Sequence, residues 1–105
     1  MADPLLHCVF FRRKADVGDK ALLALYGAFD HFVNGFDGAS DFRAGPNESP
    51  EGLHHGFRDG FVIGFDSPEA RDRYLEDPDH KALGARLVEM IDGGVAGLLV
   101  FDMAL

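Results

Sequence analysis

The chain has 105 residues, about the length of one typical domain, so we expect a single domain over 1–105. Its hydrophobic fraction of 47% is usual for a globular protein and too high for a disordered chain. Eighteen acidic against ten basic residues give a net charge of −8, which disfavours polyanions, so we expect no nucleic-acid partner.

The N-terminal half predicts a strand, a helix and a weaker strand. The run 5–11, LLHCVFF, is apolar and β-prone, which is typical of a buried strand. Asp16 is a candidate N-cap for a helix whose apolar positions recur every three or four residues until Asn34-Gly35. Residues 39–45 alternate in polarity like an edge strand. A long polar loop, rich in proline and glycine, follows over 46–56.

The C-terminal half predicts a strand, a broken helix and a last strand. Residues 57–65 indicate a third strand, because one face carries Asp59 among large apolar side chains and the other carries mainly glycine and valine. The sequence SPE at 67–69 is a helix start, and DPD at 77–79 restarts the helix, which ends at Gly93-Gly94. The apolar run 95–101, VAGLLVF, predicts the fourth strand.

This order of elements, β-α-β-β-α-β, predicts the fold class. It is the split βαβ pattern of ferredoxin-like α+β proteins, in which a four-stranded antiparallel sheet carries both helices on one face.

The other face of this sheet also needs a cover. Strands one and four are apolar on both sides, and two helices can cover only one. A second copy of the chain, packed sheet to sheet, would bury the apolar surface that remains. We therefore expect a homodimer, a dimeric α/β barrel, with Leu6, Cys8 and Phe10 toward the partner and His7 on the helix-facing side.

Features of the N-terminal strand and its flanks predict the compartment. Cys8 is the single cysteine and lies in an apolar run, where free cysteines are commonly buried in reducing conditions. Asp3 and Pro4 stand where a signal peptide would be basic and then apolar, and no stretch is long enough to span a membrane. We expect a cytoplasmic protein with no membrane partner.

Several sequence blocks together resemble the stress-responsive A/B barrel (Dabb) family, and they cover essentially the whole chain. They are the strand-one histidine before an apolar run, SPEGL, HGFRDGFVIGF, Tyr74 followed by DPDH, and the terminal LLVFD. The resemblance implies a homodimeric ferredoxin-like barrel in which each subunit encloses a small apolar cavity between its sheet and its helices.

The resemblance also implies site residues, by analogy with plant polyketide cyclases of the family that close a ring on a linear poly-β-ketone without a cofactor. The catalytic histidine matches His80, its tyrosine partner matches Tyr74, and the strand-one histidine matches His7. Asp59 replaces the histidine of the family's YTH motif, so an anion stands where an imidazole is usual. The pocket wall matches seven apolar or aromatic residues, namely Val9, Phe11, Tyr26, Phe29, Phe61, Ile63 and Leu83.

His80 has a chemical and a structural interpretation. It falls on the apolar stripe in the first turn of its helix, where the helix dipole disfavours an added proton while Asp77 and Asp79 favour it. We expect these effects to keep its pKa near the ordinary value of about 6.5, which suits a general base, with Tyr74 as its helper. The alternative is a buried His–Tyr hydrogen bond of purely structural value.

His7 and Asp59 share the helix-facing side of two neighbouring strands, so a buried His–Asp pair is expected. Such a pair would serve acid–base chemistry or simply satisfy two buried polar groups. The histidines and acids of the loop around His54-His55, and those at 77–80, have no spacing that specifies a metal. We expect neither a metal nor a cofactor.

Three functions stay open. The leading hypothesis is a binding or stress-associated dimer whose pocket holds a small apolar organic molecule. The alternative is a cofactor-independent cyclase, isomerase or lyase that acts on a carbonyl or polyketide-like substrate, with His80 as general base. A purely structural role is the third, and whether the chain is an enzyme is left open.

Overall fold

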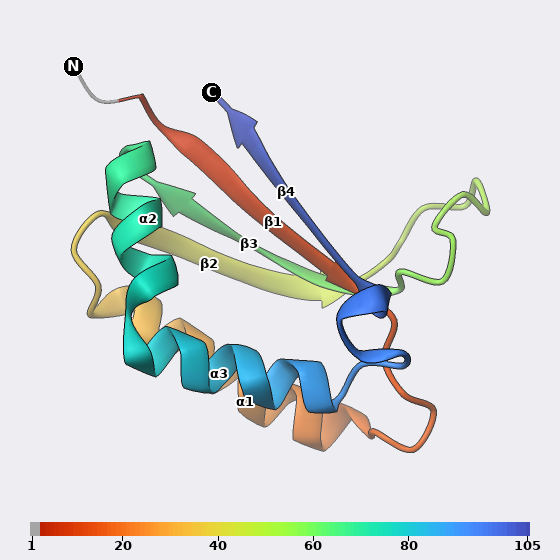
Figure 1. Ribbon diagram of the computed structural model, residues 1–105. Helices are drawn as coiled ribbons and strands as arrows, with labels where there is room; N and C mark the ends of the chain where they lie inside the picture. The colour runs from red at the N-terminus through yellow and green to blue at the C-terminus, as the bar shows by residue number, and fades with distance from the viewer. Residues whose placement is uncertain (1–2) are drawn as a thin grey trace.

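The structure, a computed structural model, describes residues 3–105 and contains one sheet and one layer of helices (Figure 1). The strands are β1 (Leu5–Phe11), β2 (Ala39–Pro46), β3 (Asp59–Phe65) and β4 (Leu98–Ala104). The helices α1 (Asp19–Asn34), α2 (Pro68–Glu76) and α3 (Pro78–Glu89) lie on one side of the sheet. A short 3-10 helix, η1 (Gly94–Gly97), precedes β4. The predicted ferredoxin-like α+β fold is confirmed.

The sheet has the strand order β2-β3-β1-β4, and every neighbouring pair is antiparallel. β1 and β3 are therefore the central strands, and their helix-facing side chains are the most deeply buried. β2 lies at one edge and carries an irregularity between Ser40 and Arg43. β4 lies at the other edge, where its pairing with β1 brings C-terminal residues beside the first strand.

Two predicted helix starts are confirmed by their capping hydrogen bonds. The Ser67 side chain accepts from the Ala70 amide, and the Asp77 side chain accepts from the Asp79 amide. Proline follows each cap, and the residue before a proline disfavours helical geometry, so the helical segment breaks into α2 and α3 at Asp77. The break turns the chain and sets the first turn of α3 against the end of α2.

The predicted start of the first helix was wrong. Asp16 does not cap α1, which begins at Asp19 with Gly18 as an N-cap that makes no side-chain hydrogen bond. An ion pair from Arg13 to Asp19, 2.8 Å long, links the first turn to the end of β1 instead.

The predicted bounds of two strands also need correction. β3 begins at Asp59 rather than Phe57, and β4 spans Leu98–Ala104 rather than 95–101. Gly93 adopts a left-handed φ of 81°, which turns the chain directly into η1 and delays the strand. The later register brings Asp102 into the sheet, opposite His7.

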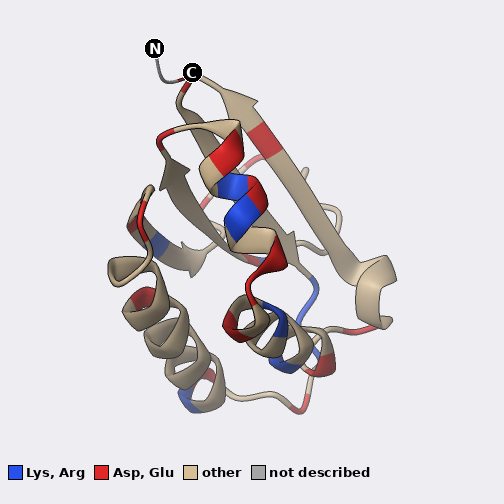
Figure 2. Cartoon of the chain, turned by 60° about the vertical axis from the view of Figure 1, so that its left-hand side comes forward, with Lys and Arg blue, Asp and Glu red and all other residues tan. Residues whose placement is uncertain are grey.

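The two faces of the sheet differ in burial. The helix-facing side forms a continuous core, with Phe11, Leu25, Phe29 and Ile63 almost completely buried. The opposite side leaves large apolar side chains of β4 about half exposed. Figure 2 shows that acidic and basic residues gather on the helices and loops, whereas the strands are mostly uncharged. No helix within residues 3–105 is long and apolar enough to cross a membrane.

Candidate functional site

His7 is a buried polar residue at the centre of the sheet. It faces the helices with 4% of its surface exposed, and its Nδ1 lies 2.6 Å from Oδ1 of Asp102 on β4. An ionised carboxylate only accepts hydrogen bonds, so this contact places a proton on Nδ1. The other ring nitrogen, Nε2, is then the acid–base position of a neutral His7.

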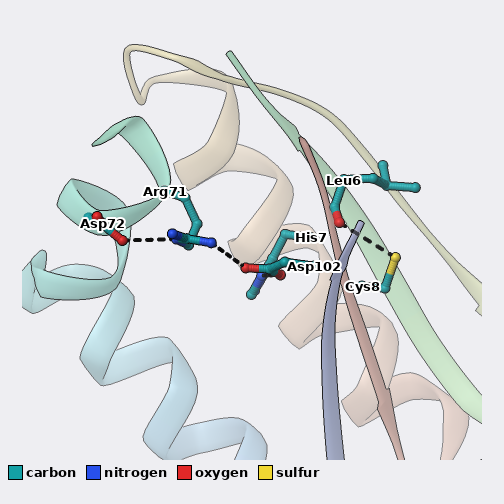
Figure 3. A network of polar contacts seen from close by, with 6 residues as sticks. All are labelled: Leu6, His7, Cys8, Arg71, Asp72 and Asp102. Atoms are coloured by element: carbon teal, nitrogen blue, oxygen red, sulfur yellow. Dashed lines mark hydrogen bonds and ion pairs between the residues drawn. The ribbon is translucent and has the colours of Figure 1, made fainter. Parts of the chain in front are cut away.

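Asp102 is also bound from the helical layer (Figure 3). Arg71 on α2 donates from Nη1 to Oδ2 of Asp102 at 2.8 Å, and from Nε to Asp72 at 2.9 Å. These hydrogen bonds, the one to Asp102 first, raise the pKa of Arg71 above its ordinary value. The hydrogen bonds from Arg71 to Asp102 and from His7 to Asp102 thus connect α2, β4 and β1, and they orient the imidazole of His7.

Tyr74 and His80 complete this group, which we call the histidine–tyrosine cluster (His7, Tyr74 and His80). Tyr74 is fully buried, and its ring centroid lies 4.2 Å from that of His80 and 6.1 Å from that of His7. Within the described part of the chain, neither the Tyr74 hydroxyl nor Nδ1 of His80 has a hydrogen-bond partner, although both atoms are buried. Buried polar atoms are nearly always paired, so two unpaired atoms on these neighbouring rings need an explanation.

The protonation of the cluster follows from its burial. Burial lowers the pKa of His80, and the nearby His7 lowers it further, while the backbone carbonyl of Leu75 acts in the opposite direction. The expected pKa near the ordinary value was therefore wrong, because loss of hydration outweighs the acidic neighbours. Burial likewise raises the pKa of the Tyr74 phenol. At neutral pH the site contains a neutral imidazole beside a protonated phenol.

The expected pairing of His7 with Asp59 was also wrong. Both side chains are buried on the helix-facing side, but the strand register pairs His7 with Ile63 and Phe11 with Asp59. The two polar groups therefore lie four residues apart along the sheet. Asp59 instead forms an ion pair with Arg13, whose Nε lies 3.2 Å from Oδ2 of the carboxylate.

A family model extends over almost the whole chain. The model of the Stress Responsive A/B Barrel Domain matches residues 5–105. The chain belongs to this family. The predicted family is thereby confirmed.

Solved structures of similar fold agree with this assignment to the A/B barrel family. A dimeric ferredoxin-like protein of unknown function from Jannaschia sp. CCS1 superposes with a TM-score of 0.89 at 26% identity, covering 97% of this chain and 99% of that one. A protein from Arabidopsis thaliana gives a TM-score of 0.84 at 26% identity, covering 93% and 91% of the two chains. Hydroxynitrile lyase from Passiflora edulis shares the fold alone, with a TM-score of 0.86 at 15% identity and coverage of 100% and 95%. No curated protein matches the sequence significantly.

The residues expected to line the apolar cavity of the A/B barrel lie in the packed core. All are buried and belong to one continuous hydrophobic cluster, namely Val9, Phe11, Tyr26, Phe29, Phe61, Ile63 and Leu83. Leu83 and Tyr26 each also border a pocket that opens at the surface, and the two pockets are different ones. A ligand role for these residues stays a prediction.

Sequence reasoning missed two polar residues of the site. Asp102 was left out because the fourth strand was predicted to end at Phe101. Its alternation with Leu98 and Val100 on the helix-facing side was the available signal. Arg71 was missed because a helical arginine between acidic residues is typical of a solvated surface, and only the fold brings it to β4.

Metal ligands do not gather in the described part of the chain. Within residues 3–105, no group of three or more histidine, cysteine, aspartate or glutamate side chains is arranged to hold a metal ion.

Proposed function

We propose that this A/B barrel protein is a homodimer that binds a small carbonyl compound at the histidine–tyrosine cluster and transfers a proton on it, using side chains alone. One observation carries the proposal. The Tyr74 hydroxyl and Nδ1 of His80 are buried without a partner among residues 3–105, beside an imidazole that Asp102 already orients. The carbonyl oxygen of a ligand would accept from the Tyr74 hydroxyl, and a hydroxyl group or an acidic C–H next to that carbonyl would face the unprotonated Nδ1 of His80.

Each member of the cluster suits a separate role. The lowered pKa of His80 keeps its imidazole neutral, so it can take a proton from a hydroxyl or from a carbon next to a carbonyl. The raised pKa of Tyr74 keeps its phenol protonated, so it can donate a hydrogen bond to the developing oxyanion. His7 keeps Nε2 for a second proton transfer because Nδ1 is bound to Asp102. A cyclase, an isomerase or a lyase requires these steps.

The approach to the cluster lies between α1 and α3. A pocket of about 530 Å³ opens there, which is within the usual range for small-molecule sites. Asp79 and Leu83, which flank His80 on α3, line this pocket together with Phe32. The half-buried Phe32 ring has its centroid 5.7 Å from that of Tyr74. Phe32 thus borders both the pocket and Tyr74, and in this proposal rotation of its side chain opens the way for a ligand.

The open face of the sheet supports the dimer. Phe10, Leu99, Phe101 and Met103 project from β1 and β4 on the side away from the helices, each between 36% and 53% exposed. Such a contiguous apolar surface is costly in water and is usually covered by a partner. A second copy offers the same surface across a twofold axis, and the Jannaschia neighbour is itself described as dimeric.

Turnover of two probe substrates tests the catalytic part. Mandelonitrile, a hydroxynitrile, should be cleaved to benzaldehyde and hydrogen cyanide, and a linear diketone should close to a ring with loss of water. We expect acceleration of at least one reaction, a loss of about 100-fold or more in His80→Ala, and a retained circular dichroism spectrum. Equal turnover by wild type and His80→Ala would contradict the proposal. Saturable binding without turnover would leave only a binding function.

Light scattering after size-exclusion chromatography tests the dimer separately. The wild-type chain should elute with twice the mass of 11.5 kDa, and Phe101→Glu should shift it toward the monomer by placing a charge in the interface. Val95→Glu is the matched control, because Val95 is equally apolar and 70% exposed but lies in η1, outside the strands. A wild-type monomer at micromolar concentration would rule out the sheet-paired dimer.

A further inference from the structure

A second pocket opens on the helix-facing side of the sheet, at the end opposite to the histidine–tyrosine cluster. It has a volume of about 490 Å³ and lies where α1 meets the last residues of β2. Leu22 and Leu23 of α1 and Ala44 and Pro46 of β2 supply apolar walls. Its polar residues include Tyr26, Arg13 and Asp59.

Tyr26 presents a buried polar atom to this second pocket. Its side chain is 8% exposed, and its hydroxyl has no hydrogen-bond partner within residues 3–105. Burial raises the pKa of the phenol, the charge of Asp59 raises it further, and Arg13 lowers it. The hydroxyl therefore lies within the field of both charges without bonding to either, and it stays protonated as a hydrogen-bond donor.

Asp59 supplies the complementary acceptor. It is 8% exposed, and its ion-pair contact runs through Oδ2 to Nε of Arg13. A carboxylate has about four acceptor positions, so Asp59 can accept further hydrogen bonds besides its contact with Arg13. Asp19 also lines the pocket and contacts Arg13, but its side chain is 86% exposed, so water screens its charge. The buried part of the pocket therefore holds the negative charge of Asp59 against the positive charge of Arg13. A charged ligand would upset that balance and lose its hydration, whereas a neutral ligand would not.

We propose that this second pocket binds a neutral phenol or alcohol, whose hydroxyl oxygen accepts from Tyr26 and whose hydroxyl hydrogen donates to Asp59. A hydroxyl both donates and accepts, so one group completes the hydrogen bonding of both residues. The apolar part of the ligand then lies against the leucine, alanine and proline walls. This inference concerns a site separate from the histidine–tyrosine cluster and does not depend on the proposed function.

Titration with benzyl alcohol tests the proposal, with the backbone amide signals of Leu23 and Ala44 followed by NMR. We expect saturable shifts in the wild type and about tenfold weaker binding in Tyr26→Phe, because one hydrogen bond is lost without a change in ring shape. Tyr74→Phe is the matched control: it removes the other unpaired tyrosine hydroxyl and should leave this affinity unchanged. A ligand series on the wild type gives a check that needs no variant: toluene, benzoate and benzylammonium should each bind about tenfold more weakly than benzyl alcohol.

Several results would overturn the proposal. One is the absence of saturable shifts in the wild type, and another is the same affinity in wild type and Tyr26→Phe. Binding of benzoate or benzylammonium as tight as that of benzyl alcohol would remove the argument from charge balance. Loss of binding in Tyr74→Phe with retention in Tyr26→Phe would assign the probe to the histidine–tyrosine cluster instead.

Discussion

Two ends of the same sheet surface each bury a tyrosine hydroxyl that has no partner within residues 3–105, but the ionisable groups beside the two tyrosines differ. At the end near α2, Tyr74 lies among two histidines and the Arg71–Asp102 ion pair lies at the edge of the cluster. At the end near the start of α1, Tyr26 has the Arg13–Asp59 ion pair as a pocket neighbour. The first end thus places imidazoles beside its tyrosine, and the second places an ion pair beside its tyrosine.

The comparison explains how one fold can offer two kinds of site. An imidazole can both take up and release a proton, which suits acid–base chemistry. An arginine–carboxylate pair is better suited to fixing the orientation of a ligand. The proposed proton transfer therefore suits the cluster at His80, and the proposed ligand binding suits the pocket at Asp59.

Removal of Asp102 should have the largest effect on the folded state. Asp102→Ala leaves the buried His7 and the guanidinium of Arg71 without their shared acceptor. We expect the free energy of unfolding to fall by about 2 kcal/mol, since the Asp102 side chain is partly exposed and water can replace part of the loss. Urea denaturation measures this change.

Asp72→Ala is the control for that variant. It removes the other carboxylate that Arg71 contacts, at a side chain that is 66% exposed. Exposed ion pairs contribute little, so the free energy of unfolding should change by less than about 0.5 kcal/mol. Similar losses in the two variants would show that the contact with His7 is not what makes Asp102 important.

The pH dependence of stability should report on His80, at the end near α2. Because the folded state lowers the pKa of His80, the unfolded chain binds more protons as the pH falls below the ordinary value of 6.5. His80 therefore adds stability that is fully present above that value and is lost as the pH falls toward its folded-state pKa. Replacement by glutamine should flatten this part of the curve of unfolding free energy against pH.

His31→Gln serves as the control, because His31 is exposed on α1 and should leave the curve nearly unchanged. If His80→Gln keeps the wild-type slope below pH 6.5, burial of the His80 imidazole does not govern the loss of stability in acid.

The sequence predicted the architecture well because hydrophobic periodicity and capping residues act locally. The LLHCVFF strand, the Ser67 cap and the Asp77 restart each follow from a few neighbouring residues, and the structure agrees with all three. Asp16 failed as a cap because the loop continues to Gly18 before α1 begins, and a favourable residue type does not fix where the backbone turns.

The polar partners could not be predicted in the same way because they depend on strand register. Asp102 lies 95 residues from His7 in the chain, and a shift of three residues in the start of β4 decides whether it enters the sheet. The same register places Asp59 opposite Phe11 and so separates it from His7. The helix-facing side was predicted correctly for His7 and Asp59, whereas their separation along the strands was not.

The smallest expected effect provides the closest comparison of the two ends. Tyr74→Phe and Tyr26→Phe each remove a buried hydroxyl that makes no hydrogen bond within the described chain and keep the ring. Removing an unsatisfied group relieves its desolvation cost, so each variant should unfold within about 1 kcal/mol of the wild type, toward higher stability. Differential scanning calorimetry measures the shift in each. A loss beyond that range at one end would reveal a hydrogen bond to that tyrosine in the free protein. The tyrosine at that end would then be structural rather than kept for a ligand.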